Sequence, residues 1–255
     1  MRTAIRTGIV MLAAFFSIST LYAQDSSKYQ VYYIHEDPVN TSMVAPYEKT
    51  ATDLVANCKK VKLADGWLTL TMEDYRYIYV TPIKDMGELD KNTFEPLEKS
   101  MGREAYLKMF ADFDKCYDSH RDYTIVLNKE YSYMPGGVNI NPEGTPYRHF
   151  TYYYITPQNF AKAREIAKAF HDLYVKKGSK LQYRLYRSGF GEKENYYLVV
   201  AGAKSAEEYE KMSAENRILL GDEGKELYGK LLQTISGVKD ISATAREDLS
   251  YMPGK

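Results

Sequence analysis

The residues best suited to chemistry are tyrosines, one arginine and one histidine on segments that alternate like β-strands. The chain has 25 tyrosines, against nine phenylalanines and one tryptophan. A tyrosine ring packs like an apolar side chain while its hydroxyl bonds to a polar partner. Successive strand residues point to opposite faces, so the alternation predicts which side chains share an interior. The predicted interior residues are Tyr33, His35, Thr69, Thr71, Tyr77, Tyr79, Tyr153, Arg184, Tyr186 and Tyr197.

Such an interior suits a small aromatic or amphipathic ligand. Its flat body would lie among the tyrosine rings, and the Arg184 guanidinium would pair with an acidic group. The same phase places Ile78, Val80, Leu198 and Val200 on the opposite side, against helices. The alternative is that the rings simply fill the interior as core, and both interpretations stay open.

Other reactive residue types give weaker signals. His120 belongs to a charged loop and His149 precedes a strand, so both are expected at the surface. The sequence has no glycine-rich phosphate loop, no Gly-x-Ser-x-Gly and no His-Glu-x-x-His. No catalytic residue is therefore assigned, and we expect no metal site and no bound cofactor.

Two cysteines, Cys58 and Cys116, fall late in the first and second predicted helices. In an exported chain they raise the question of a disulfide. Helices side by side on one sheet face would allow a bridge, but antiparallel helices would separate these ends. The alternative is two buried free thiols that behave as small apolar groups.

The N-terminus predicts a cleavable export signal over residues 1–23. Arg2 and Arg6 precede an apolar run over residues 8–18, and small residues end the segment before Gln24. The first cysteine is Cys58, so a lipid anchor is not expected, and no later stretch is long and apolar enough to span a membrane. We expect a periplasmic or secreted protein.

Charge excludes one class of partner. Removing the signal leaves 34 − 2 = 32 basic against 34 acidic residues, a net charge of 32 − 34 = −2. A nucleic-acid-binding protein needs a clustered basic face, so no nucleic-acid partner is expected.

An internal duplication organises the chain. Tyr-Ser-Tyr-Met-Pro-Gly at residues 131–136 returns as Leu-Ser-Tyr-Met-Pro-Gly at residues 249–254, and residues 77–90 match residues 197–210 as strand, turn and helix start. Self-similarity at a fixed period is a strong guide to architecture. We therefore expect a first repeat over residues 24–136, a turn-rich linker over 137–147 and a second repeat over 148–255.

Each repeat reads as β-α-β-β-α-β. In the first, we predict strands at 29–36, 66–72, 75–82 and 123–129, a helix at 46–61, and a helical region at 86–117 broken near Pro96 and Gly102. In the second, we predict strands at 150–155, 181–188, 196–201 and 241–251, a helix at 158–176 and a broken helical region at 206–235.

This order is that of the ferredoxin-like fold, an α+β class in which both helices cover one sheet face. The bare face of each sheet must be covered. Two antiparallel sheets that face each other as a pseudo-dimeric α/β barrel meet this need within one chain. A monomer is then expected to be stable, although sheet edges that pair across a two-fold axis would give a homodimer.

The chain resembles the fused form of the dimeric α/β-barrel superfamily, which includes antibiotic-biosynthesis monooxygenases, NIPSNAP-like proteins and chlorite dismutases. The resemblance covers residues 29–254. It rests on the element order, on lysine-led turns at residues 84–89 and 204–209, and on the paired Met-Pro-Gly endings.

Three functions stay open. The first is a non-enzymatic envelope module that binds a small molecule or a partner protein. The second, suggested by the resemblance, is an oxidoreductase or monooxygenase on a phenolic or quinone-like substrate, with Arg184 orienting the substrate and His35 or a tyrosine transferring protons. The third is heme binding, for which the resemblance suggests a helical histidine such as His171. The alternative is that His171, at the edge of the apolar stripe and beside Asp172, is a solvated residue on the helix flank. Fold analogy alone does not choose among them.

Overall fold

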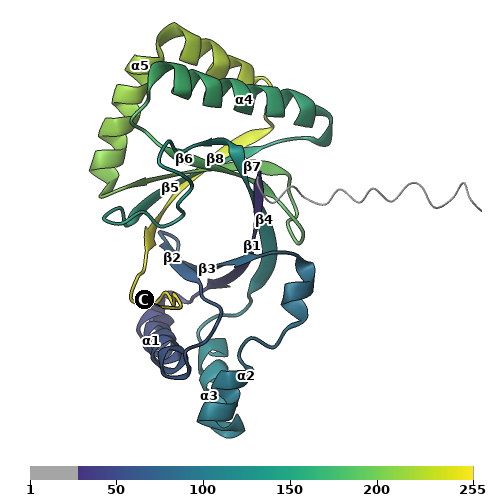
Figure 1. Ribbon diagram of the computed structural model, residues 1–255, viewed down its shortest axis with the longest axis vertical. Helices are drawn as coiled ribbons and strands as arrows, with labels where there is room; N and C mark the ends of the chain where they lie inside the picture. The colour runs from purple at the N-terminus through teal and green to yellow at the C-terminus, as the bar shows by residue number, and fades with distance from the viewer. Residues whose placement is uncertain (1–27, 255) are drawn as a thin grey trace, which may run out of the picture.

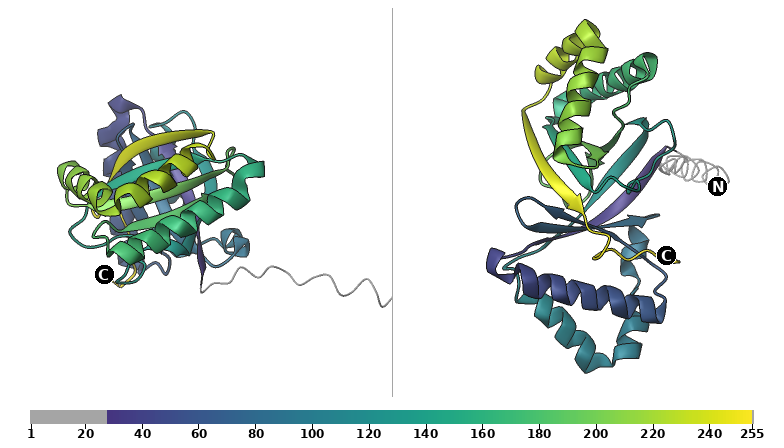
Figure 2. Two further views of the ribbon diagram at one scale, coloured as in Figure 1. Left: turned by 90° about the horizontal axis from the view of Figure 1, so that it is seen from above. Right: turned by 90° about the vertical axis from the view of Figure 1, so that its left-hand side faces the viewer.

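The computed structural model describes residues 28–254, and the predicted export signal over residues 1–23 lies outside this range. Eight strands close into one barrel, with a helical layer on each of two opposite sides (Figure 1). Helices α1, α2 and α3 cover the first half's strands, and α4 and α5 cover the second half's (Figures 1 and 2). Within the described residues, no helix is long and apolar enough to cross a membrane.

The first half has seven main elements. They are β1 (Tyr29–Pro38), α1 (Val44–Val61), β2 (Leu68–Met72), β3 (Arg76–Ile83), α2 (Glu95–Met101), α3 (Arg103–Asp114) and β4 (Arg121–Tyr133). The predicted order of elements is confirmed. The expected break in the helical region is at Gly102, whose φ of 80° is readily adopted only by glycine.

The second half repeats this order. Its elements are β5 (Tyr147–Tyr154), α4 (Phe160–Lys177), β6 (Tyr183–Ser188), β7 (Tyr196–Ala203), α5 (Ala206–Leu232) and β8 (Gly237–Ala245). The helical region is kinked at Gly221, with a φ of 59°. The last strand begins and ends earlier than the predicted 241–251, because the chain leaves the sheet after Ala245.

The barrel closes by exchange between the halves. Its strand order is β1-β3-β2-β8-β5-β7-β6-β4, and every neighbouring pair is antiparallel. At the two seams, β4 of the first half pairs with β6, and β8 of the second half pairs with β2. Each half therefore contributes its last strand to the hairpin of the other, which leaves neither sheet with an open edge.

The duplicated lysine-led turns fold alike. Glu88 and Glu208 each accept a hydrogen bond from a backbone N–H four residues earlier, at Lys84 (2.8 Å) and Lys204 (2.6 Å). Asp85 and Ser205 cap the following helical turns by accepting from Gly87 N and Glu208 N. These reciprocal contacts resemble a capping box and explain why the two matching segments begin helices at the same point.

Buried residues form three cores. One fills the barrel and includes Tyr32, Ile34, Ile78, Val80, Phe150, Tyr186, Leu198 and Val200. A second joins the first half's sheet to its helices through Tyr47, Leu54, Cys58, Tyr77 and Phe113, among others. A third joins Tyr133, Tyr183 and Leu185 to α4. Both faces of the sheet are thus buried, one against the barrel interior and the other against helices.

Candidate functional site

The candidate site lies inside the barrel, at the end where the linker between the halves crosses it. Arg148 on β5 and Arg184 on β6 both point inward there, and they are 1% and 2% exposed. Successive side chains of a strand point to opposite faces of the sheet. The residue before each arginine points outward, so the arginine points inward and borders the barrel core. Two guanidinium groups are thus held out of water in one region.

The linker supplies part of their hydrogen bonding. Arg148 donates through Nη1 to the carbonyl oxygens of Thr145 and Tyr147, and through Nη2 to Asn141 Oδ1 at 2.9 Å. Arg184 donates through Nη1 to the Asn139 carbonyl at 2.8 Å. The Arg184 Nε is buried and has no hydrogen-bond partner among residues 28–254.

Charge at this end is uncompensated. No carboxylate in the described part of the chain forms an ion pair with either arginine. Burial, helped by the positive charge of Arg184, lowers the pKa of Arg148 to about 10. Burial raises the pKa of the nearby Tyr32 and Tyr186 hydroxyls, so both rings stay neutral at physiological pH. This end of the barrel therefore has a net positive charge that a bound anion would offset.

Aromatic and aliphatic side chains continue from the arginines toward the middle of the barrel. Tyr32 and Tyr186 pack edge to face, with ring centroids 6.1 Å apart. Ile140 from the linker and Met252 from the C-terminal segment pack against the same core. Because this core fills the middle of the barrel, a ligand would occupy the arginine end, where linker residues now lie.

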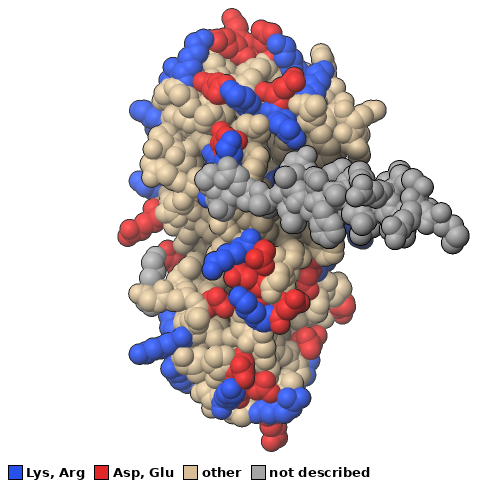
Figure 3. Space-filling view, turned by 45° about the vertical axis from the view of Figure 1, so that its right-hand side comes forward, with Lys and Arg blue, Asp and Glu red and all other residues tan. Residues whose placement is uncertain are grey.

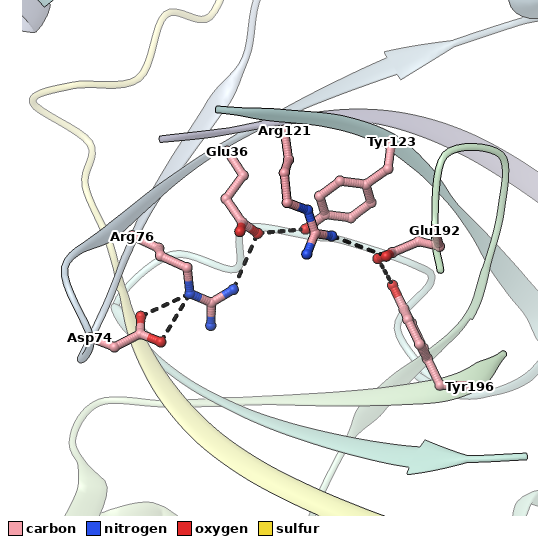
Figure 4. Close-up of polar contacts among 7 residues, drawn as sticks. All are labelled: Glu36, Asp74, Arg76, Arg121, Tyr123, Glu192 and Tyr196. Carbon is pink, nitrogen blue, oxygen red and sulfur yellow. Dashed lines mark hydrogen bonds and ion pairs between the residues drawn. The ribbon is translucent and has the colours of Figure 1, made fainter. Parts of the chain in front are cut away.

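The opposite end of the interior is polar but self-paired (Figure 4). Arg76 Nη1 lies 3.1 Å from Glu36 Oε2, which also accepts from Tyr123 OH at 3.0 Å. Arg121 Nη2 lies 3.0 Å from Glu192 Oε2, and Tyr196 donates to the other oxygen of Glu192. Arg76 also pairs with Asp74. Every charged side chain of this network has a partner within it, so the network does not need a ligand to offset its charge.

The structure places two of the ten predicted interior residues in the interior, namely Arg184 and Tyr186. The other eight alternate with barrel-core residues and face the helices or the outer surface. Their predicted direction is wrong for Tyr33, His35, Thr69, Thr71, Tyr77, Tyr79, Tyr153 and Tyr197. Conversely, Ile78, Val80, Leu198 and Val200, predicted to face helices, line the interior.

The physical reason is that both sheet faces are covered. In a sheet with one wet face, polar residues mark the outside, whereas here the outer face also packs against helices and is aromatic. Tyr77, for example, packs against Tyr47 of α1 with ring centroids 4.6 Å apart and donates to Glu48 at 2.7 Å. Alternation therefore predicts which residues share one face of the sheet, but not whether that face points into the barrel or toward the helices.

The four histidines all lie outside the barrel interior. His149 stacks on Tyr209 with centroids 4.2 Å apart, and His171 Nδ1 lies 3.2 Å from Asp172 Oδ1. His35 lies between Asp37 and Asp122 on the outer side of β1. Burial acts to lower the pKa of His35, but hydrogen bonds and charges from these two carboxylates outweigh burial and raise the pKa to about 9.

The two cysteines are free thiols and are buried in the helix-side core. Of the two alternatives that the sequence left open, a disulfide and two buried thiols, the structure has two buried thiols. Burial raises the pKa of the Cys58 thiol to about 12. Cys116 Sγ donates to the Asp112 carbonyl at 3.3 Å within its own helical region.

On the face in Figure 3, basic and acidic side chains are interspersed over both halves. Many form ion pairs one turn apart on helices, such as Lys49 with Asp53 and Lys168 with Asp172.

Comparison with known proteins identifies the architecture. No family model matches the chain, and no curated protein matches it. Among solved structures, a monooxygenase-like protein from Lactobacillus acidophilus has a TM-score of 0.53 at 8% identity, covering 89% of this chain and 97% of its own. An anthrone oxidase-like protein has a TM-score of 0.55 at 14% identity, covering 89% and 94%. A monooxygenase-like protein from Fusobacterium nucleatum has a TM-score of 0.53 at 13% identity, covering 86% and 93%. At such identities the likeness concerns the fold, and the chain has the duplicated, ferredoxin-like fold of the dimeric α/β-barrel proteins.

Proposed function

We propose that this protein is a binding module that holds a small anionic molecule with an apolar body at the arginine end of its barrel. The observation that carries the proposal is the pair of buried arginines, Arg148 and Arg184, without a carboxylate partner in the described chain. The predicted export signal supports a role outside the cytoplasm, which the N-terminal mass of the protein from its own host would test.

The cost of such a pair supports a ligand. Burying a charge without a counter-charge costs several kcal/mol, so buried arginines are normally paired with carboxylates. Backbone carbonyls offset part of that cost for Arg148, but Arg184 keeps an unused Nε–H in a buried position. A carboxylate can accept two parallel N–H groups from one guanidinium, and this geometry would use Nε.

The residues around Arg184 indicate what the apolar part of the ligand would contact. Tyr32 and Tyr186 offer ring faces and edges next to Arg184, and Ile140 of the linker closes the same region. An aromatic carboxylate combines both requirements. Entry requires the linker to move, and residues 136–139 at its start are exposed.

The two alternative functions gain less from the structure. The oxidoreductase hypothesis used His35 or a tyrosine for proton transfer, and heme binding used a histidine ligand. Every histidine of residues 28–254 lies outside the barrel interior, so only a tyrosine is left for proton transfer there. Arg184 and Tyr186 remain available to orient a substrate. Ligand binding is therefore the first function to test.

The experiment compares matched ligands and matched arginines. Benzoate and 4-hydroxybenzoate are titrated against benzamide and phenol, which keep the ring but lose the charge, with calorimetry and thermal unfolding as readouts. We expect the carboxylates alone to bind, and a ligand at about 100 times its Kd stabilises the protein by about 2.7 kcal/mol. Inorganic phosphate, which is an anion without an aromatic ring, tests whether charge alone is enough for binding.

Arg184→Met is the decisive variant, and Arg187→Met is its control, because Arg187 lies on the same strand but is exposed. We expect Arg184→Met to lose the response to carboxylates while its ligand-free Tm stays level or rises, since an uncompensated charge has been removed. If the neutral ligands bind as well as the carboxylates, or if Arg184→Met destabilises the free protein and wild type ignores the anions, the arginines are structural and the proposal is wrong.

A further inference from the structure

We propose that His35, Asp37 and His120 form a binding site for one divalent transition-metal ion, best suited to Zn²⁺, on the outer side of the barrel. One ligand atom from each residue lies within 4.8 Å of the others. The site is separate from the arginine end, since His35 and Asp37 alternate with the interior residues Ile34 and Glu36. It lies where β1 passes the loop that leads into β4.

The distances require only a small adjustment. His35 Nε2 and Asp37 Oδ1 are already 3.1 Å apart. Ligand atoms around a tetrahedral zinc ion lie about 3.3 Å apart, which follows from bonds of roughly 2.0–2.1 Å. His120 supplies the third ligand atom, and it is exposed on a short loop before β4, so its side chain can rotate inward. Its ring centroid lies 5.2 Å from that of His35.

Asp37 carries the second, independent observation. Its carboxylate is nine-tenths or more buried, and Oδ2 accepts from Tyr47 OH at 2.6 Å. The other oxygen, Oδ1, is also buried, accepts no hydrogen bond of good geometry within residues 28–254, and is ion-paired with His35 Nε2 at 3.1 Å. A metal ion bound between Oδ1 and Nε2 would replace this ion pair and satisfy the buried carboxylate oxygen in its place.

A second layer of contacts orients the ligands. His35 Nδ1 lies 2.8 Å from Asp122 Oδ1, the residue opposite His35 in the β1–β4 register, and Asp122 also accepts from Tyr33 OH. A metal ion would displace the proton on Nε2, while the proton on Nδ1 stays directed at Asp122, so that the Nε2 lone pair faces Asp37 and His120. Histidine ligands are commonly fixed by such a carboxylate, which also makes the imidazole a better donor to the metal.

Charge favours a cation here. Asp37 and Asp122 flank His35, and neither forms an ion pair with a lysine or arginine in residues 28–254. Three protein ligands of mixed nitrogen and oxygen type leave a fourth position open, as in zinc sites that bind a water or a substrate atom. Because His120 is exposed, that fourth position would face solvent.

The test uses the full chain without an affinity tag, stripped with EDTA and titrated with ZnCl₂ against a chromophoric chelator. We expect one high-affinity ion per chain, a rise of Tm with added zinc, and, with Co²⁺ in its place, the visible absorption of a tetrahedral complex. His120→Ala should weaken binding at least tenfold, and Asp122→Asn, which keeps the ligands but weakens their orientation, should weaken it about 10- to 100-fold.

Two histidines serve as matched controls. His149 and His171 also lie beside one aspartate each, and His149→Ala and His171→Ala should leave zinc affinity unchanged. His120 is exposed, so its variant is expected to fold, which unfolding of the metal-free protein will check. Zinc affinity that is the same in His120→Ala and wild type, or no binding at micromolar zinc, would show that His35 is only a histidine held between two aspartates and would overturn the proposal.

Discussion

Ser132 and Ser250, the serines of the two duplicated motifs, make the same pair of hydrogen bonds at opposite seams of the barrel. Ser132 Oγ donates to the Asn128 carbonyl at 2.6 Å and accepts from Leu185 N at 2.9 Å. Ser250 Oγ donates to the Arg246 carbonyl at 2.7 Å and accepts from Thr69 N at 2.8 Å. Each serine thus ties the last segment of one half to the hairpin of the other half.

The tyrosines that follow these serines repeat the relationship. Tyr133 OH donates to the Ser179 carbonyl at 3.0 Å, just after α4, and Tyr251 OH donates to the Leu63 carbonyl at 2.8 Å, just after α1. The motif was repeated in the sequence because the barrel has two equivalent seams. Both copies fix an end of a strand and a helix C-terminus at once.

Removing either serine hydroxyl should destabilise the fold. Ser132→Ala leaves the buried Leu185 N–H without its acceptor, and Ser250→Ala does the same to Thr69 N–H, each at about 1–3 kcal/mol. The two seams share no partner, so the double variant should lose the sum to within about 0.5 kcal/mol. Urea unfolding with an unchanged m-value measures this.

Ser100→Ala is the control, because Ser100 is exposed on α2 and the change should stay within about 0.5 kcal/mol. A large effect at one seam with none at the other would contradict the equivalence of the two motifs.

Gly66 should not tolerate a side chain. A Cβ at this position would lie 2.4 Å from the Tyr251 carbonyl oxygen and 2.5 Å from Pro253 Cδ. Trp67 and Tyr251 exchange two backbone hydrogen bonds beside it, of 2.8 and 3.1 Å. Gly66→Ala must push the C-terminal segment off β2, so we expect a loss of about 1–3 kcal/mol and faster proteolysis of residues 249–254.

The matched substitution lies in α5. Gly229 has nothing within 4 Å of its Cβ position, so Gly229→Ala should stabilise the protein by about 0.5–1 kcal/mol through helix propensity. If both alanines behave alike in thermal unfolding, close packing at Gly66 is not what limits that site.

The order of elements was readable from the sequence because each helix carries a one-sided apolar stripe. On α1, for example, Tyr47, Ala51 and Cys58 recur at helical spacing in the sequence and are buried. The duplication then predicted a closed barrel, because a ferredoxin-like sheet has one bare face. These signals are local or repeated, so a single chain reveals them.

The sequence did not show which face of each strand points into the barrel. Most of the predicted site residues were placed on the wrong face for this reason. Tyr77 and Ile78 are both apolar and both buried, so nothing local distinguishes the helix side from the interior. Arg184 was placed correctly, but Arg148 was missed, because a charged residue at the start of a strand looks like a solvent-exposed one. His35 and His120 come together only through the β1–β4 pairing, which no local pattern predicts.

The two thiols should resist modification in the folded protein. Cys58 and Cys116 are 0% and 1% exposed, and burial raises the pKa of both, which keeps them as unreactive thiols. We expect reaction with a thiol reagent at the rate of unfolding, two thiols per chain in denaturant, and no change of Tm with reductant. A Tm that falls with reductant would show a disulfide instead.

The contact of Arg246 with α1 should make the free energy of unfolding depend on pH in the acid range. Arg246 bonds to Glu48 on α1 and to Asp248, and Glu48 also accepts from Tyr77. Hydrogen bonds from Arg246 are the main cause that lowers the pKa of both carboxyls. A carboxyl whose folded pKa is lowered stabilises the protein above its unfolded pKa of roughly 4, and this contribution is lost as pH falls through the folded pKa.

Arg246→Met should therefore cost about 1 kcal/mol at pH 7, a modest value because all three side chains are partly exposed. The difference from wild type should shrink as pH falls below about 4, because protonated carboxyls no longer gain from the arginine. Lys225→Met removes a fully exposed pair with Asp222 and should show no such dependence. Urea unfolding of the three proteins at several pH values measures the effect, and a gap between Arg246→Met and wild type that stays constant into acid would mean that Arg246 acts by packing its stem rather than by its charge.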